Sequence, residues 1–211
     1  MNRTTRWSIL ILAIAGVCWA VPPVHFHSLK KQEQAQTATV FNAKDFVATF
    51  WPQTLLPATA NAADAAKVLD AINSDPKKVR EQFGRTVGVS SSYFLFIRGS
   101  GRVVSVASDS IGLSMKPAGT DADIVVPIDF VFGNAVRDGT GLLDSSKYPN
   151  AQEFNDISAQ LNDIVEKQVL PEFQRIAKVG GRVQFSGCAE VADESTDLKP
   201  MKLMPISVKA E

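Results

Sequence analysis

The order of secondary structure predicted from residue 92 onward constrains the fold of this chain more than any other feature. The stretch SYFLFIRGSGRVVSVAS (92–108) is rich in aromatic and β-branched residues, which is typical of a strand. IGLSM (111–115) and DIVVPIDFVFG (123–133) predict two further strands. An amphipathic helix follows from a cap at Asn150 to a break near Pro171, and two alternating strands end the sequence.

Three strands, a helix and two strands is the order of an OB-like barrel, in which the helix lies between strands three and four. The glycine-rich stretches RGSGR and VGGR suit the sharp bends of such a barrel. We therefore predict a single α+β domain over 41–211, with a helical part at 41–84 and a five-stranded OB-like barrel at 90–211. A small barrel is filled by its own side chains, so a ligand site would lie on an outer face or at the junction with the helices. The predicted interior residues are Phe94, Phe96, Val104, Val126, Val183 and Phe185.

The helical part contains signals for three helices. Asn42 is a suitable N-cap for the first, and Pro52 kinks or ends it. The second is predicted to begin at a cap at Asn61, and the third follows Asp75 and ends at Gly84. The apolar stripe of the first helix consists of Phe46, Val47, Phe50 and Trp51.

The N-terminal segment has the pattern of an export signal. Two arginines precede an apolar run at 9–21. The run is short for a membrane-spanning helix, but the neighbouring residues can lengthen it enough to serve as a membrane anchor. We assign 1–24 to a signal peptide or membrane anchor and 25–40 to a polar tether. The predicted location is the periplasmic side of the bacterial inner membrane, either anchored or exported, with the membrane contacted through the N-terminal segment.

The two cysteines have different expected fates. Cys18 is a candidate for lipid attachment, but branched Val17 stands where a small residue normally precedes such a cysteine. An uncleaved anchor and ordinary cleavage near Ala20 are the alternatives. Cys188 is expected to be a lone thiol on the outward side of its strand, with no catalytic role.

Charge and histidine content exclude several classes of function. Lys plus Arg and Asp plus Glu number 22 each, so no global field attracts a nucleic acid, and we expect no nucleic-acid partner. His25 and His27 lie in the tether, and the rest of the chain has no histidine for a Ser-His-Asp triad. We expect neither a metal site nor a cofactor.

The segment FGNAVRDGTGLLD (132–144) holds the strongest candidate binding residues. Asn134, Arg137 and Asp138 follow an apolar strand and can hold a hydroxyl-rich ligand through paired hydrogen bonds. The alternative is an Arg–Asp pair that fixes a loop to the barrel. Trp51 can stack on a sugar, although its helical spacing also suits a place in the core.

Paired carboxylates make a hydrolase an alternative hypothesis. A glycosidase needs two carboxylates facing each other across the sugar. Each pair here also suits a turn or a solvated surface. The pairs are Asp121 with Asp123, Asp129 with Asp138, and Asp193 with Glu194.

Together these segments resemble a known family. FNAKDFVATFWPQTLLP, SYFLFIRGSGRVVSV, FGNAVRD, QLNDIVEKQVLPEF, GGRVQFSGCAEV and MKLMPISVKAE are similar to the predicted periplasmic lipoproteins of the domain of unknown function 2291 family, over most of 40–210. Members are often encoded beside ribose-type sugar ABC transporters, which implies an accessory role in sugar uptake with transporter components as partners. Arg137 and Asp138 match the family's recurring Arg-Asp, no catalytic residues carry over, and the region before Cys18 departs from a lipid-attachment motif.

Three hypotheses for function follow. The first is a noncatalytic, membrane-tethered periplasmic accessory or binding module linked to sugar ABC transport. The second is a carbohydrate-active hydrolase that uses aspartates. The third is a structural protein of the envelope, which requires an exposed apolar patch around Phe46, Phe50 and Trp51.

Overall fold

The computed structural model describes residues 41–129, 131, 133–148 and 150–211. Residues 42–211 form one compact unit. The export segment at 1–24, the tether at 25–40 and Cys18 lie outside the described residues.

The first helix begins where the sequence predicts and passes Pro52 without ending. In α3 (Ala43–Phe50), the Asn42 side chain accepts hydrogen bonds from the backbone N–H groups of residues 44 and 45. The helix then widens into a π-helical turn, η1 (Trp51–Leu55), in which the Leu56 N–H bonds the Trp51 carbonyl five residues back. This turn precedes Pro57, which has no N–H to donate to a regular ladder. The segment closes with α4 (Leu56–Ala58) and η2 (Thr59–Asn61).

The N-cap of the second helix lies three residues after its predicted position at Asn61. Asn61 ends η2, and Ala62 turns extended, so the chain forms β1 (Ala63–Asp64) beside β3 before it becomes helical. Asp64 is therefore the N-cap, and its Oδ1 accepts from the N–H groups of residues 66 and 67. The rest of the region is α5 (Ala65–Ser74), α6 (Pro76–Phe83) and β2 (Gly84–Arg85). Helix α6 follows Asp75 as predicted, and Asp75 is its N-cap.

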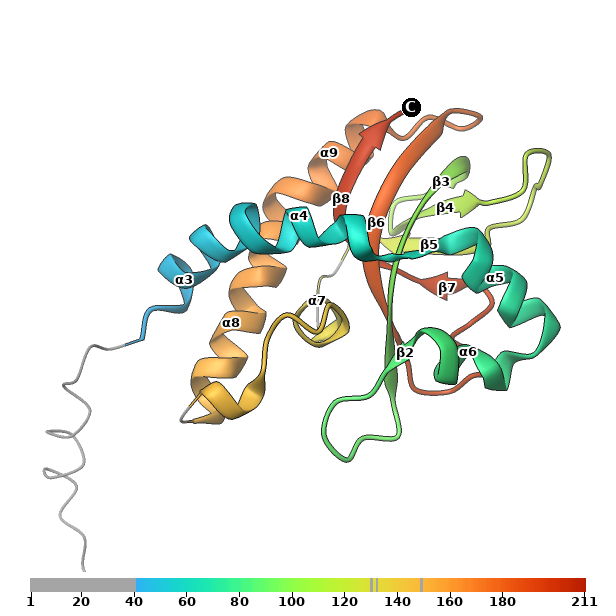
Figure 1. The fold of residues 1–211 in the computed structure, drawn as a ribbon. Helices are drawn as coiled ribbons and strands as arrows, with labels where there is room; N and C mark the ends of the chain where they lie inside the picture. The colour runs from blue at the N-terminus through green and yellow to red at the C-terminus, as the bar shows by residue number, and fades with distance from the viewer. Residues whose placement is uncertain (1–40, 130, 132, 149) are drawn as a thin grey trace, which may run out of the picture. The chain divides into compact units, whose positions relative to one another are not determined.

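The strands form one curled sheet in the order β7-β5-β4-β3-β6-β8, with β1 and β2 also paired to β3 (Figure 1). Only Leu203 separates β7 from β8, and β7 runs parallel to β5 while β8 pairs with β6. The sheet therefore curls back toward its own first edge. The five predicted strands correspond to β3, β4, β5, β6 and β8, with the predicted helix after the third, and the sheet contains in addition the two-residue strands β1, β2 and β7. The strands are β3 (Tyr93–Val106), β4 (Ser110–Ser114), β5 (Ile124–Pro127), β6 (Arg182–Val191), β7 (Met201–Lys202) and β8 (Met204–Ala210).

The predicted helix between the third and fourth strands continues beyond Pro171, so the predicted break there is wrong. The arrangement at Pro171 is the same as that at Pro57. In both places a π-helical turn ends two residues before the proline. The Leu170 N–H bonds the Val165 carbonyl. The elements of this region are α7 (Ala135–Gly139), η3 (Ser145–Lys147), α8 (Ala151–Ile164), η4 (Val165–Val169) and α9 (Leu170–Ile176).

The barrel interior is built from the opposite set of β3 residues to the one predicted. Leu95, Ile97 and Val103 are fully buried, whereas Phe96 and Val104 are only half-buried. Side chains alternate along a strand, so Phe96 shares its face with the polar residues that follow it. Phe94 also lies on this second face, where it is buried beside α7. Val126, Val183 and Phe185 are buried as predicted.

The apolar stripe of α3 and η1 is part of the core. Phe50 and Trp51 are buried, and Phe46 is half-buried and stacks on Phe50 with ring centroids 5.4 Å apart. Helix α3 packs on α8. These residues form no exposed apolar patch, so that expectation of the envelope-structure hypothesis is wrong.

Candidate functional site

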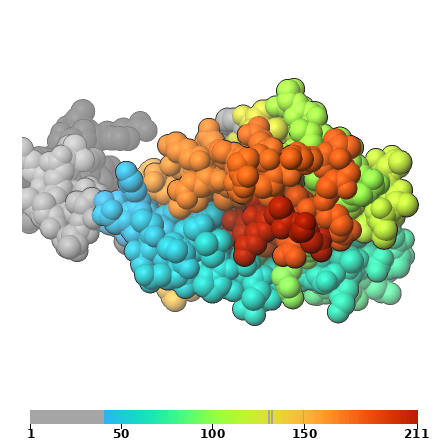
Figure 2. Space-filling model, turned by 90° about the horizontal axis from the view of Figure 1, so that it is seen from above, coloured from blue at the N-terminus to red at the C-terminus, as the bar shows by residue number. Residues whose placement is uncertain are grey.

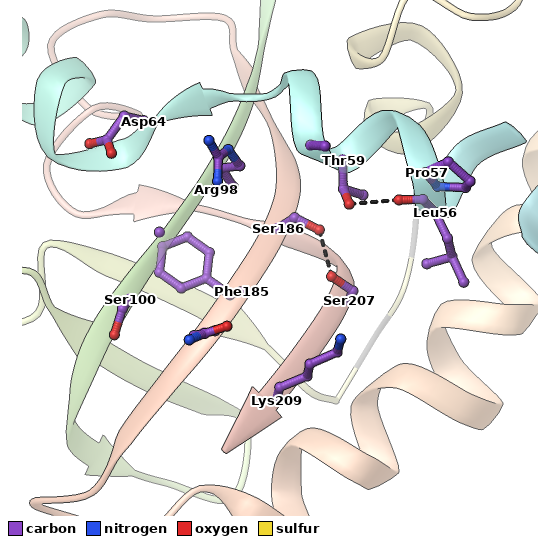
Figure 3. Close-up of a pocket in the computed structure, with 13 residues that line it drawn as sticks. Leu56, Pro57, Thr59, Asp64, Arg98, Ser100, Phe185, Ser186, Ser207 and Lys209 are labelled. Carbon is purple, nitrogen blue, oxygen red and sulfur yellow. Dashed lines mark hydrogen bonds between the residues drawn. The ribbon is translucent and has the colours of Figure 1, made fainter. Parts of the chain in front are cut away.

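A depression of about 620 Å³ lies on the outer face of β3, β6 and β8, beside the segment Leu56–Ala60 (Figure 3). The strand register explains its polar floor. Arg98, Ser186 and Ser207 are cross-strand neighbours in one row, and the next row holds Ser100, Gln184 and Lys209. Residues directly opposite on neighbouring strands share a face, so all six side chains point to the same side of the sheet.

Several polar groups in the depression have no protein partner. Within the described residues, the side chains of Arg98, Gln184 and Lys209 form no hydrogen bond or ion pair. The hydroxyls of Ser186 and Ser207 lie 2.7 Å apart and share one hydrogen bond, which leaves further bonding capacity on both oxygens (Figure 3). The floor thus offers a ligand the exposed side chains of Arg98, Gln184 and Lys209 and the half-buried hydroxyl of Ser207, whereas Ser186 is only 3% exposed.

Two carboxylates border the depression, and both are already engaged. Asp64 is turned toward the start of α5, where it caps the helix. Glu211 accepts a hydrogen bond from Arg182 Nε at 2.7 Å and another from the Ser100 hydroxyl. These hydrogen bonds lower the pKa of the Glu211 carboxyl, so it stays charged and paired.

The other side of the depression is apolar. Leu56 and Pro57 form this wall, and the Thr59 hydroxyl is bonded to the Leu56 carbonyl at 2.6 Å (Figure 3). Figure 2 shows β8, in red, at the surface between the N-terminal helical segment in cyan and residues in orange. The site thus combines a polar floor with one apolar side and is open to solvent.

The predicted pair Arg137 and Asp138 lies elsewhere, in α7, and the two residues bind each other. Arg137 Nε and Nη2 donate to the two carboxylate oxygens at 2.7 and 2.9 Å. Arg137 Nη1 donates to the Phe154 carbonyl and to Asn155 Oδ1 on α8, and the guanidinium lies 4.0 Å from the Phe154 ring centroid. The two residues are 6% and 7% exposed. This geometry fits the alternative of an Arg–Asp pair with a structural role, except that the pair fixes the short helix α7 to α8 and not a loop to the barrel.

The other two predicted binding residues do not join this pair in one site. Asn134 precedes α7, and its side-chain oxygen accepts a hydrogen bond from the Ser158 hydroxyl at 2.8 Å. Trp51 lines a different hollow, of about 480 Å³, between α3, η1 and the α8 to η4 segment. None of the four predicted residues lines the depression on β3, β6 and β8.

One member of each candidate carboxylate pair serves local structure. Asp123 accepts hydrogen bonds from the Ser114 hydroxyl and the Met115 N–H, and Asp193 accepts two from Ser195. Asp138 is held by Arg137. Among the described residues, no group of three or more His, Cys, Asp or Glu side chains is placed to hold a metal ion.

Cys188 lies on the outward face of β6, as predicted, but it is buried there. Helix α7 covers this part of the face, and a Cβ on Gly139 would come within 2.8 Å of the Cys188 sulfur. Burial raises the pKa of the Cys188 thiol, which disfavours the reactive thiolate.

We therefore expect Cys188 to resist thiol reagents in the folded protein. With Cys18 replaced by serine, the native full-length chain should react with a disulfide reagent at least 100-fold more slowly than the urea-unfolded chain. The absorbance of the released thiolate measures both rates. Equal rates would show that α7 does not cover this face.

Comparison with known proteins places the chain in a family. Residues 9–209 match the family described as predicted periplasmic lipoprotein (DUF2291). The chain belongs to this family. The description agrees with the location predicted from the N-terminal segment, a membrane-anchored protein of the periplasm. Within the described part of the chain, no helix is long and apolar enough to span a membrane. Lipid attachment at Cys18 stays a prediction.

A solved structure shares the fold of this DUF2291 protein. The crystal structure of an OB-fold protein from Thermotoga maritima aligns with a TM-score of 0.70 at 23% identity, over 81% of this chain and 99% of the other. The predicted OB-like α+β fold is thereby confirmed. No curated protein matches the chain.

Sequence reasoning did not identify the residues of the depression. Arg98, Ser186 and Ser207 are distant in the sequence and become neighbours only through the pairing of β3, β6 and β8. One signal was present, because the outward positions of the last strand include Ser207 and Lys209. Polar residues on an outer strand face are common, so this signal alone does not indicate a site.

Proposed function

We propose that this DUF2291 protein is a noncatalytic, membrane-tethered periplasmic binding module that acts as an accessory to a sugar ABC transporter. One observation carries the binding role: the unpaired side chains of Arg98, Gln184 and Lys209 surround a hydroxyl pair in a single depression. Such groups can orient a hydroxyl-rich ligand through several hydrogen bonds.

The shape of the depression also suits a sugar. A sugar ring has hydroxyl groups around its edge and C–H groups on its faces. The polar floor can bond the hydroxyls, while Leu56 and Pro57 can pack against the C–H groups. An open depression favours weak, rapidly exchanging binding, which suits a protein that passes its ligand on.

The transport role draws on the family resemblance and on location. A periplasmic protein held at the membrane stays close to the outer side of a transporter, and tethering raises the effective concentration of the two partners. Transporter components are therefore the proposed protein partners. Deletion of the gene should reduce uptake of at least one sugar, and unchanged uptake of every sugar tested would contradict the transport role.

The engaged carboxylates favour binding over hydrolysis. A glycosidase keeps one carboxyl group free to donate a proton and another free to attack or to activate water. Asp138 is bonded to Arg137 on both oxygens, and Asp123 is bonded to Ser114 and to a backbone N–H.

The binding role predicts a loss of affinity when one hydroxyl is removed. In full-length protein in detergent, Ser207→Ala should weaken binding of the best ligand in a panel of pentoses, hexoses, sugar acids and sugar phosphates about 5- to 10-fold, as expected for one hydrogen bond worth about 1 kcal/mol. Isothermal titration calorimetry measures the affinity.

The matched control is Ser105→Ala, which removes an exposed hydroxyl from β3 outside the depression and should leave affinity unchanged. Equal effects of the two substitutions would place the ligand elsewhere. Absence of binding by every compound would contradict the proposed binding role.

A further inference from the structure

We propose that the ligand is an anion, namely a hydroxyl-rich molecule that carries a carboxylate or phosphate group held by Arg98 and Lys209. This inference rests on the proposed function and names the class of ligand for the same depression. It draws on the balance of charge around the site and on the positions of the two cations.

The charges that face the depression do not cancel. Arg98 and Lys209 have no carboxylate partner among the described residues. Asp64 bonds the first turn of α5, and Glu211 is neutralised by Arg182. Two cations therefore face the depression, while the Asp64 carboxylate is turned toward α5 (Figure 3). The site thus carries a positive charge, although the formal net charge of the chain is zero.

The two cations approach the floor from opposite sides. Arg98 lies on β3 and Lys209 on β8, two strands apart and one row along, which places their Cα atoms about 12 Å apart. Both side chains are long, and both line the same depression (Figure 3). The hydroxyls of Ser186 and Ser207 lie in the row that begins at Arg98, so an anionic group and neighbouring hydroxyls can be bound together.

The chemistry of the two cations favours acidic over neutral sugars. A guanidinium forms two parallel hydrogen bonds to a carboxylate or phosphate, and an ammonium adds a second positive charge. Bonds between charged partners are about twice as strong as those between neutral groups. A neutral sugar uses the same hydroxyl contacts but leaves both cations without a counter-charge.

Calorimetry on full-length protein in detergent with matched ligands tests this inference. The ligands are glucose, glucuronate, glucose 6-phosphate and inorganic phosphate. At least one of the two acidic sugars should bind 10-fold or more tightly than glucose, and a comparison of the two separates carboxylate from phosphate recognition. Arg98→Gln should remove most of this preference, and added salt should weaken binding of the acidic sugar.

Lys116→Gln is the charge-matched control, because Lys116 is exposed and lies outside the depression. It should leave the preference intact, and thermal melting should show that both variants are folded. Equal binding of glucose and both acidic sugars would overturn the anion inference while the proposed binding role stands. Inorganic phosphate that binds as tightly as glucose 6-phosphate would show that hydroxyls contribute nothing. Failure of all four ligands and of the wider sugar panel would contradict the proposed function itself.

Discussion

Asp138→Ala should lower the free energy of unfolding by about 3 to 5 kcal/mol. Asp138 is the only charged partner of Arg137 among the described residues, and both side chains are buried in α7. Without the carboxylate, the Arg137 guanidinium remains in a site largely closed to water, held by the Phe154 carbonyl, Asn155 and the Phe154 ring. The cost of a buried charge without a counter-charge dominates this loss.

Urea unfolding of the full-length chain in detergent, followed by circular dichroism, measures this effect. Asp121→Ala is the control, because Asp121 is exposed, and its effect should stay within about 0.5 kcal/mol. Replacing both members of the pair, with Arg137→Met and Asp138→Leu, should recover much of the stability, since no buried charge then remains. A loss below about 1 kcal/mol in Asp138→Ala would show that water reaches the pair.

Gly187→Val should lower the free energy of unfolding by about 3 kcal/mol, near the upper end for overpacking. A Cβ at Gly187 would collide with the Met204 carbonyl oxygen and come within 3.0 Å of the Leu203 side chain. The first contact is with backbone, so rotation of a side chain cannot relieve it. Gly187 also lies at the register shift between β6 and β8, where the chain leaves β7.

The same unfolding measurement on Gln184→Val provides the control on β6. Gln184 is exposed, and valine favours strands, so this variant should stay within about 0.5 kcal/mol of the original. If Gly187→Val unfolds at the same urea concentration as the original protein, β8 does not approach β6 as closely as described.

Local signals predicted most of the secondary structure. The predicted caps at Asn42 and Asn150 and the predicted helix start after Asp75 are correct. A capping side chain bonds N–H groups only two or three residues away, so the signal is local in the sequence. The prolines were harder to interpret. Pro57 and Pro171 both follow π-helical turns, and the rule that proline interrupts a regular helix does not cover this arrangement.

The features that the sequence did not predict depend on contacts between segments that are distant in the chain. The outer face of β6 is exposed at Gln184 but buried at Cys188, because α7 covers only part of it. Strand alternation alone assigns these two residues the same environment. The row of Arg98, Ser186 and Ser207 likewise depends on the register of three strands, which no local pattern specifies.

The position of β7 and β8 after the other strands of the sheet affects biogenesis. A chain exported from its N-terminus delivers residues 201–210 to the periplasm after all the other strands. Until then β5 and β6 each present an unpaired edge, which is open to pairing with another chain and to proteases. Ser207 and Lys209 arrive with β8, so the depression is incomplete until the sheet is finished, and the proposed ligand site forms only then.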